Sequence, residues 1–215
     1  MILGVTGLIG SGKDTIADYL VTEHGFKRIS FAASLKDAVA AVFNWDREML
    51  EGTTKQSRKW REKVDIWWAE RLEMPNLTPR WVLQYWGTDV FRNHFHTDIW
   101  VASVENKLRQ TVDNVVITDC RFSNEVNAIK EAGGVTCRVT RGEQPEWYNA
   151  AIAYNKGPVR NYEWLLSKDK LDKAKVHASE YSSVGLDYDS YIDNNGTIND
   201  LHEQVSQLLN LRDAS

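Results

Sequence analysis

A glycine-rich segment near the N-terminus constrains the fold of this chain more than any other feature. The sequence GLIGSGKDT occupies residues 7–15. A short apolar run, MILGVT, precedes it, and an amphipathic stretch that extends to residue 24 follows it. An order of strand, glycine turn and helix with the spacing G-x-x-x-x-G-K is typical of a phosphate-binding loop. The glycines let successive backbone N–H groups face one anion, which the helix N-terminus also stabilises.

Lys13 is the candidate catalytic cation of this loop, because its ammonium group can follow a phosphoryl group during transfer. Such loops usually carry Ser or Thr directly after the lysine, where the hydroxyl binds Mg²⁺. Here Asp14 takes this place and Thr15 follows it. Asp14 either holds a metal-bound water or stabilises the start of the helix as a carboxylate, and both alternatives remain open. Together with Gly10 and Gly12, these three residues are the predicted phosphate-binding residues of the loop.

Composition limits the class of protein. The chain has 215 residues, of which 42% are hydrophobic and 26% charged, which is ordinary for one globular domain. Its formal net charge of −4 argues against a general nucleic-acid-binding protein, which is usually basic. No apolar run approaches the ~20 residues of a membrane span. Cys120 and Cys137 fall in predicted buried strands and indicate core thiols in a reducing compartment.

Strand and helix patterns alternate along most of the chain. Such alternation predicts an α/β fold with a parallel sheet of about five strands and helices on both faces. The predicted strands are residues 1–6, 26–31, 114–118, 135–140 and 188–193. The predicted helices are residues 13–24, 34–43, 54–72, 79–86, a continuation after Gly87 to residue 108, 124–132, and a last helix that ends near residue 211.

Two segments have no clear place in this alternation. The predicted helix 54–72 carries an aromatic stripe, for which core packing is favoured over base stacking. Residues 142–178 have mixed composition, with six Lys or Arg and three Asp or Glu between residues 156 and 176. We expect a mobile cover there and call residues 142–178 the lid segment.

Several polar residues follow the predicted strands or share one helix face. Ligands of open α/β sheets bind at the carboxyl ends of the strands, so Lys36 is a candidate for a second phosphate, with a solvated surface lysine as the alternative. Arg80 and Gln84 are four residues apart and share a helix face, where they suit a phosphate and a base edge. Gly87 and Thr88 interrupt the helix pattern, which predicts either a close approach of a ligand or a simple kink.

Asp119 ends the most apolar predicted strand, and Arg121 follows two positions later. An aspartate at this place can hold a metal-bound water, and an arginine can stabilise charge on a transferring phosphoryl group. Glu125 either takes part in this site or forms a structural ion pair with Arg121. Arg141 ends the next strand and is a candidate phosphate clamp, with ordinary surface charge as the alternative.

Four segments together resemble the deoxynucleoside monophosphate kinases of tailed bacteriophages, which are P-loop nucleotide kinases. They are GLIGSGKDT (7–15), FAASLKDAVA (31–40), RWVLQYWGTD (80–89, with Trp100 and Val101 following) and DCRFSNE (119–125); HASE (177–180) is a looser match. The resemblance implies a P-loop NTPase fold like that of nucleoside monophosphate kinases. It implies a single kinase domain over residues 1–215, with an acceptor-binding region at about 32–101 and a lid at about 142–178.

The resemblance also implies an activity: transfer of the γ-phosphoryl of ATP to a deoxynucleoside 5′-monophosphate, with Mg²⁺, for deoxynucleotide supply. It implies small nucleotides as partners, and neither nucleic acid nor membrane. It implies a location in the cytoplasm, that of the host for a phage-encoded chain. A homodimer is an open alternative to a monomer. The implied catalytic residues are Lys13, Arg121, Asp119 and Arg141. The implied ATP-binding residues are Gly10, Gly12, Lys13, Asp14, Thr15, Asn195 and Gly196. The implied acceptor-binding residues are Lys36, Arg80, Gln84, Gly87, Thr88, Trp100, Asp119, Arg121 and Glu125.

Two other functions are compatible with a phosphate-binding loop. One is a kinase for another small phosphorylated acceptor, which shares the loop but not the segment 80–89. The other is a nucleotide-hydrolysing switch. A guanine-specific switch needs an N-K-x-D segment, and the segments NKGP (155–158) and NKLR (106–109) both lack its aspartate.

Overall fold

Five parallel strands form one sheet in the computed structural model, which describes residues 1–213. The strand order is β2-β3-β1-β4-β5, so β1 lies at the centre of the sheet. The glycine-rich loop that follows β1 therefore leaves the middle of the carboxyl edge of the sheet. This arrangement confirms the predicted fold class. The strand bounds are β1 Ile2–Thr6, β2 Lys27–Ile29, β3 Val115–Ile117, β4 Val135–Thr140 and β5 Ser190–Asp193.

The chain divides into two compact units. Unit 1 comprises Met1–Ser30 and Gln110–Ser215 and contains the whole sheet. Unit 2 comprises Phe31–Arg109, the segment in which the resemblance places the acceptor-binding region. The assignment of the whole chain to one kinase domain stays a prediction.

Helices cover both faces of the sheet in unit 1. Leu3 and Val5 of β1 pack with α1 (Lys13–His24) and α12 (Ile198–Asp213) in one hydrophobic cluster. Gly4 lies between them in sequence and faces α8 (Ser123–Glu131), where a Cβ atom would come within 2.5 Å of the Ile129 side chain. Because successive residues of a strand face opposite sides, β1 packs against helices on both faces of the sheet. The helix predicted at residues 13–24 is confirmed at its bounds.

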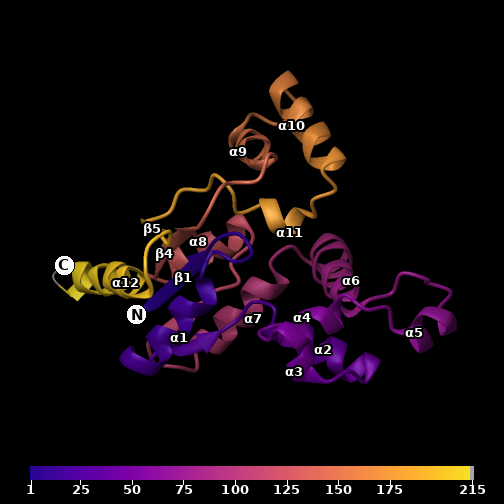
Figure 1. Cartoon of the computed structure of the whole chain (residues 1–215), viewed down its shortest axis with the longest axis horizontal. Coiled ribbons are helices and arrows are strands. Elements are labelled where there is room, and N and C mark those ends of the chain that lie inside the picture. The colour runs from indigo at the N-terminus through magenta and orange to yellow at the C-terminus, as the bar shows by residue number, and fades with distance from the viewer. Residues whose placement is uncertain (214–215) are drawn as a thin grey trace. The chain divides into compact units, whose positions relative to one another are not determined.

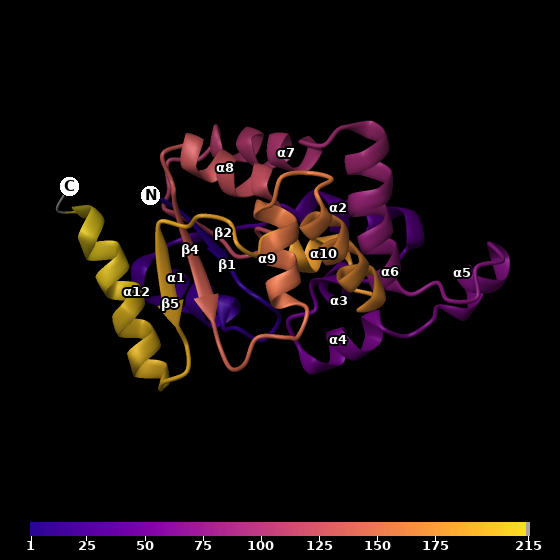
Figure 2. The ribbon, with the colours of Figure 1, turned by 90° about the horizontal axis from the view of Figure 1, so that it is seen from above.

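The lid segment is helical. It contains α9 (Tyr148–Lys156) and α10 (Tyr162–Lys173), which lie side by side and stand off the sheet (Figures 1 and 2), and it leads into α11 (Ala178–Tyr181). Ala151, Leu171 and Val184 form a small hydrophobic core of their own, and Leu8 of the glycine-rich loop packs against it. Mobility of this segment stays a prediction, whereas its two helices were not predicted.

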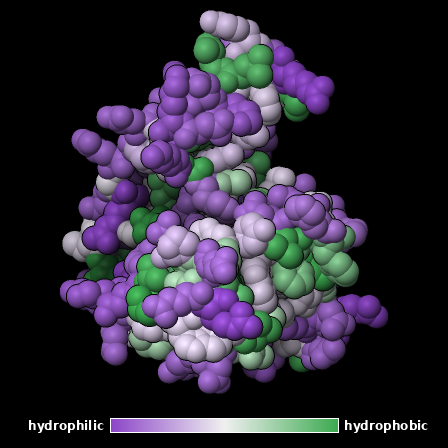
Figure 3. Space-filling view, turned by 90° about the vertical axis from the view of Figure 1, so that its right-hand side faces the viewer, coloured by the Kyte–Doolittle hydropathy of each residue, from purple (hydrophilic) through white to green (hydrophobic). Residues whose placement is uncertain are grey.

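Hydrophobic side chains are also exposed on this helix pair. Val159, Tyr162 and Leu165 are all more than half exposed. Green surface appears at the upper end of the molecule in Figure 3, the level at which α10 stands in Figure 1.

Unit 2 consists of short helices. The helix bounds are α2 Ala33–Phe43, α3 Arg47–Glu51, α4 Lys55–Arg61, α5 Ile66–Arg71, α6 Pro79–Gln84, a π-helix η1 Tyr85–Phe95, and α7 Ile99–Leu108. An aromatic cluster holds several of them together. The ring of Phe43 lies 4.4 Å from that of Trp45, 4.8 Å from that of Trp68 and 5.4 Å from that of Trp86.

The prediction of one helix over residues 54–72 is wrong, because two helices with separate N-caps occupy this stretch. Thr54 caps α4 in a capping box with Ser57, and Asp65 caps α5 by accepting from the backbone N–H of Trp68. Asp65 also accepts a hydrogen bond from the Trp45 indole at 2.8 Å, which fixes the break between the helices. The predicted aromatic face is therefore divided: Trp68 joins the aromatic cluster, whereas Trp67 is 61% exposed.

Gly87 does not interrupt its helix, contrary to the sequence-based expectation. The chain continues from α6 into the π-helix η1, which includes both Gly87 and Thr88. Gly87 packs closely instead, because a Cβ atom there would lie 2.8 Å from a methyl group of Leu35, which would have to shift. Single π-helical turns are often found at functional sites, so this segment remains of interest.

Both cysteines are buried free thiols, as expected. Burial raises the pKa of Cys120 far above its ordinary value and that of Cys137 to about 12, so neither is a reactive thiolate. Cys120 lies after β3 rather than in a strand, which corrects one detail of the prediction. Among the helices of residues 1–213, none has the length and apolar character that crossing a bilayer requires.

Candidate functional site

The glycine-rich loop has the backbone conformation that its glycines predict. Gly7, Gly10 and Gly12 all have positive φ values, of 155°, 81° and 104°. Gly12 precedes α1 directly, and a Cβ atom there would lie 2.2 Å from the side-chain nitrogen of Asn194. Only glycine fits at this point, both for its φ and for its contact with Asn194.

Asn194 is a site residue that the sequence analysis missed. It follows β5, is 8% exposed, and donates a hydrogen bond of 2.8 Å from its side-chain nitrogen to the backbone carbonyl of Ser11. This bond ties the loop to the far end of the chain. A polar residue directly after a strand was the available signal, but the contact was predicted at the neighbouring residues Asn195 and Gly196.

Lys13 lies folded over the loop. Its ammonium group donates hydrogen bonds of 2.8 Å to the carbonyls of Gly7 and Leu8. Burial, and then the positive charge of Arg121, lower the pKa of Lys13 to about 8. A lysine with this pKa sits in surroundings that favour an added negative charge, as a phosphate would supply.

We expect this lowered pKa to appear in the pH dependence of the ATP-dependent activity that the family resemblance implies. Lys13 of the free protein is protonated below about pH 8 and neutral above it. Loss of the positive charge weakens phosphate binding, so kcat/KM for ATP should fall as the pH rises through about 8, since this ratio reports the free enzyme. The measurement is kcat/KM for ATP from pH 6 to pH 10.

The control is Lys13→Arg, because an arginine stays protonated throughout this range. Its profile, normalised to its own maximum, should stay flat where the wild-type profile falls. A wild-type profile with no fall near pH 8, or the same fall in both proteins, would show that Lys13 is not the titrating group.

Asp14 pairs with an arginine that the sequence analysis missed. Arg28 of β2 forms an ion pair and hydrogen bond with Asp14 and donates a second hydrogen bond, of 2.9 Å, to Thr118. Within residues 1–213, Asp14 makes no hydrogen bond to the backbone of α1, so it does not act as a side-chain cap. Its role toward a metal-bound water stays a prediction.

The next residue, Thr15, is exposed, and its hydroxyl has no hydrogen-bond partner within residues 1–213. This hydroxyl is therefore open to a phosphate oxygen. The described residues contain no group of three His, Cys, Asp or Glu side chains that could hold a metal ion by themselves. The donor set therefore fits a Mg²⁺ ion held mainly by nucleotide phosphates and water rather than by a protein cage.

The turn after β3 brings Asp119 and Arg121 to the same region of unit 1, but they engage different partners. Asp119 accepts a hydrogen bond of 2.7 Å from the hydroxyl of Ser30, which follows β2. Arg121 forms an ion pair of 3.0 Å with Glu180 and lies within 3.5 Å of the Ser179 hydroxyl. The charge of Arg121 acts on Lys13, as described above, which places the two cations near one another.

Glu125 has a structural role in the turn. It is 2% exposed and accepts hydrogen bonds from the backbone N–H groups of Arg121 at 2.6 Å and Phe122 at 3.1 Å. This is one half of a capping box, in which a residue in the first turn of the helix accepts from backbone donors before it; Phe122 has no side-chain acceptor to form the other half. Glu125 thus fixes the backbone of Arg121, and a direct contact with an acceptor stays a prediction.

Two arginines at the end of β4 differ in environment. Arg138 is 3% exposed, donates a hydrogen bond of 3.1 Å to the Ser183 carbonyl, and lies within 6 Å of the ring centres of Tyr148 and Tyr188. It thus binds the segment that follows the lid, at Ser183, and adds positive charge near Lys13. Arg141 is exposed and makes no hydrogen bond or ion pair within residues 1–213, so its guanidinium is available to a ligand.

Asn195 and Gly196 lie beside the start of the lid segment. The side-chain oxygen of Asn195 accepts a hydrogen bond of 2.7 Å from the backbone N–H of Gly142, the residue after Arg141. Gly196 packs against Asp200, whose carboxylate accepts hydrogen bonds from Thr197 in a capping box. The turn 194–197 therefore connects the glycine-rich loop, through Asn194, with the segment that carries Arg141.

In unit 2, Lys36 belongs to a charged network. Its ammonium group lies 2.5 Å from the carboxylate of Glu51, which also pairs with Arg47. Burial would raise the pKa of Glu51, but its hydrogen bonds to Lys36 and Arg47 outweigh burial and lower that pKa. Lys36 is therefore a partly buried, paired lysine and not a solvated one, and a phosphate would compete with Glu51 for it.

The α6 helix presents its predicted polar face. Arg80 pairs with Glu62 at 3.1 Å, whereas the Gln84 amide makes no hydrogen bond within residues 1–213. Thr88, one turn further along the chain, is half-buried, and its hydroxyl likewise has no partner in that range. Gln84 and Thr88 thus offer donors and acceptors that a nucleotide base could use.

Trp100 lies in the core of unit 2. It is 7% exposed, its indole donates a hydrogen bond of 2.8 Å to the Gly87 carbonyl, and its ring lies 5.3 Å from that of Phe91. The structure thus shows a core position for this residue. Trp100 can influence an acceptor through the position of Gly87, and its direct contact with an acceptor stays a prediction.

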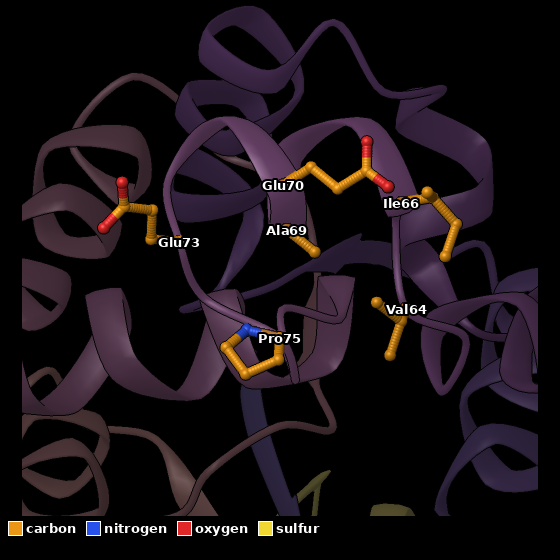
Figure 4. Close-up of a pocket in the computed structure, with 6 residues that line it drawn as sticks. All are labelled: Val64, Ile66, Ala69, Glu70, Glu73 and Pro75. Carbon is orange, nitrogen blue, oxygen red and sulfur yellow. The ribbon is translucent and has the colours of Figure 1, made fainter.

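Unit 2 also contains a hollow of about 370 Å³ beside α5 (Figure 4). Val64, Ile66, Ala69 and Pro75 line it together with two carboxylates, Glu70 and Glu73. This lining supplies no positive charge, so the hollow does not suit the phosphate of a nucleotide.

Two comparisons with protein sequences identify the family. A profile of the family described as "Deoxynucleotide monophosphate kinase" matches residues 69–152. A protein of Acanthamoeba polyphaga mimivirus, provisionally named a deoxynucleotide monophosphate kinase, is 34% identical over 155 residues, which cover 66% of this chain and 74% of that protein.

Solved structures with similar folds include other kinases. Shikimate kinase from Aquifex aeolicus has a TM-score of 0.46 and 11% sequence identity, and the match covers 100% of this chain and 99% of that one. Dephospho-CoA kinase from Campylobacter jejuni has a TM-score of 0.43 and 16% identity, with 97% and 95% of the two chains covered. Because both scores are below 0.5, the fold assignment rests on the sheet order and the loop of this chain.

The mimivirus relative is similar over nearly three quarters of its length, and the sheet and the glycine-rich loop of unit 1 agree with the family resemblance found in the sequence. This chain therefore belongs to the deoxynucleotide monophosphate kinase family.

Proposed function

We propose that this protein transfers the γ-phosphoryl group of ATP to a deoxynucleoside 5′-monophosphate and so forms the diphosphate. The observation that carries the proposal is the glycine-rich loop with Lys13 at its end, in a chain of this family. A loop of this kind binds the phosphates of the donor nucleotide through backbone N–H groups and the N-terminus of α1.

Catalysis in this proposal depends on position and charge. The attacking oxygen belongs to an acceptor phosphate that is ionised near neutral pH, so no dedicated general base is needed. Lys13, Arg121 and Arg141 stabilise charge on the transferring group, and Asp119 orients groups at the end of β3. Bound Mg²⁺ would neutralise charge on the donor phosphates, and Asp14 or Asp119 would hold it through water.

The two nucleotides use different parts of the chain. Gly10, Gly12 and Thr15 bind the donor phosphates, and the turn with Asn195 and Gly196 binds the donor base. The acceptor uses residues of unit 2: Lys36 and Arg80 for its phosphate, and Gln84, Gly87 and Thr88 for its base and sugar. Lys36 and Arg80 would exchange their carboxylate partners for the acceptor phosphate.

The product of this reaction indicates the process that the protein would serve. A deoxynucleoside diphosphate is the precursor of the triphosphate, so the protein would serve deoxynucleotide supply in the cytoplasm, that of the host if the gene is viral. The lid segment would close over the nucleotides and exclude water, which limits ATP hydrolysis.

The test is ADP release from ATP and Mg²⁺, measured with each deoxynucleoside and ribonucleoside monophosphate in turn. We expect ADP release that depends on at least one deoxynucleoside monophosphate. Release of ADP at the same rate without any acceptor would contradict the proposal and favour a nucleotide-hydrolysing protein.

We expect the accepted deoxynucleotide to be preferred to its ribonucleotide counterpart. A 2′-hydroxyl that is buried without a partner costs about 1–3 kcal/mol, which corresponds to roughly a tenfold to hundredfold difference in kcat/KM. The measurement is a competition between dGMP and GMP, and between dCMP and CMP, at low substrate concentration. Equal kcat/KM within each pair would leave a general nucleoside monophosphate kinase and remove the deoxy preference.

A further inference from the structure

Among residues 1–213, the contacts of the Arg121 guanidinium group all lie on one side of it. Its three hydrogen-bond contacts all involve Nη1: Glu180 Oε1 at 3.0 Å, the Ser179 carbonyl at 3.4 Å and the Ser179 hydroxyl at 3.5 Å. Nε and Nη2 make no hydrogen bond within residues 1–213, and the side chain is 47% exposed. Two adjacent N–H groups on one edge of an arginine are the arrangement that binds phosphate in a bidentate manner.

The backbone on each side of this contact is also fixed. Glu125 binds the backbone N–H of Arg121, as described above. On the other side, the His177 ring accepts a hydrogen bond from the backbone N–H of Ser179 at 3.2 Å and contacts the Ser179 hydroxyl at 2.9 Å. Glu180 thus reaches Arg121 from a short segment that its own neighbours hold in place.

The charge of Glu180 calls for an explanation. Its side chain is only 19% exposed, and it lies near the cations Lys13 and Arg121. A carboxylate close to a phosphate-binding loop repels the phosphates, so without a compensating role it would weaken nucleotide binding. The ion pair with Arg121 provides that role. A long arginine side chain loses conformational entropy when it is fixed, and Glu180 already fixes it in the folded protein.

We propose that Glu180 is a positioning residue for phosphoryl transfer: it holds the Nη1 side of Arg121 and leaves the Nε–Nη2 edge for the transferring phosphoryl group. This inference rests on the proposed function, since it assumes that Arg121 stabilises the transition state. It concerns the looser HASE match of the sequence, residues 177–180.

The experiment is a double-mutant cycle with Glu180→Ala, Arg121→Ala and the double variant, in which kcat and KM for ATP are measured. Glu180→Ala should lower kcat about tenfold to a hundredfold and change KM for ATP less than about threefold, because orientation matters most in the transition state. In the Arg121→Ala background, Glu180→Ala should lower kcat by less than about twofold, since the group that it orients is gone.

Two further variants complete the design. Glu180→Gln keeps a hydrogen-bond acceptor without the charge, so its kcat should lie between those of the wild type and Glu180→Ala. Glu163→Ala is the matched control, because Glu163 is an exposed glutamate of the lid segment without an ion pair in residues 1–213, and it should leave kcat unchanged. Thermal unfolding of each variant shows whether it is folded, and Glu180→Gln replaces Glu180→Ala in the cycle if the latter is not.

Each outcome decides a separate point. Equal losses of kcat from the Glu180 substitution in both backgrounds would overturn the inference, because Glu180 would then act independently of Arg121. An unchanged or increased kcat in Glu180→Ala and Glu180→Gln would overturn it as well. Failure of the wild type to transfer phosphoryl groups, or full activity of Arg121→Ala, would instead contradict the proposed function or the role of Arg121.

Discussion

Replacement of Lys13 by alanine should lower kcat by about a hundredfold to a thousandfold while the fold is retained. The ammonium group is a preorganised positive charge at the phosphate-binding loop, and removal of one such group typically has an effect of this size. Within residues 1–213, its hydrogen bonds are all to the loop itself, to the carbonyls of Gly7 and Leu8 and more weakly to Ser11, so the sheet does not depend on it. The measurement is kcat with saturating ATP and acceptor, together with thermal unfolding.

The matched control is Lys27→Ala. Lys27 begins β2, at the opposite end of the sheet from the loop, and pairs with Asp113 on the surface. This variant should have nearly normal kcat. A Lys13→Ala protein that is folded and retains most of its activity would show that the loop does not take part in phosphoryl transfer.

Replacement of Arg121 by lysine should be almost as damaging as replacement by alanine, with kcat lowered about a hundredfold in both. A lysine offers one point of charge, whereas the contacts of Arg121 require a planar group that can bind Glu180 on one side and a phosphoryl group on the other. The measurement is kcat for the two variants under the same saturating conditions.

Arg109 provides the matched pair of control substitutions, to lysine and to alanine. It is exposed at the end of α7 and has no hydrogen-bonded side chain within residues 1–213, so both changes should be nearly neutral. If Arg121→Lys keeps most of the wild-type kcat, Arg121 contributes only diffuse positive charge, and the orientation by Glu180 is unnecessary.

Local patterns in the sequence predicted the part of the site that is built from consecutive residues. The glycine spacing fixed the loop, and the apolar runs located the strands, with β4 predicted at its observed bounds. The pairing of Thr197 with Asp200 was also predictable, because a capping box is read from residues three apart.

Contacts between distant residues were not predictable in this way. Arg28 binds Asp14 from another strand, Asn194 binds the loop from the far end of the chain, and Glu180 reaches Arg121 across 59 positions. No local pattern specifies these partners, because the register of the sheet and the path of the lid segment bring them together. Arg28 and Arg138 looked like ordinary charged residues of strands for the same reason.

Helix breaks in unit 2 were the other source of error. The polar residues between α4 and α5 fit a helical pattern, but Asp65 is used as a cap and as the partner of the Trp45 indole. Conversely, Gly87 was expected to end a helix that in fact continues as a π-helix. In both cases tertiary contacts outweighed local propensity.

The fate of the γ-phosphoryl group tests the central claim most directly. The protein is incubated with ATP labelled in the γ-position, Mg²⁺ and each deoxynucleoside monophosphate, and the labelled products are separated. We predict that the label appears in a deoxynucleoside diphosphate, that this product requires the acceptor, and that Lys13→Ala nearly abolishes it. Label that appears only as inorganic phosphate, at a rate that does not depend on the acceptor, would contradict the account and identify a nucleotide hydrolase.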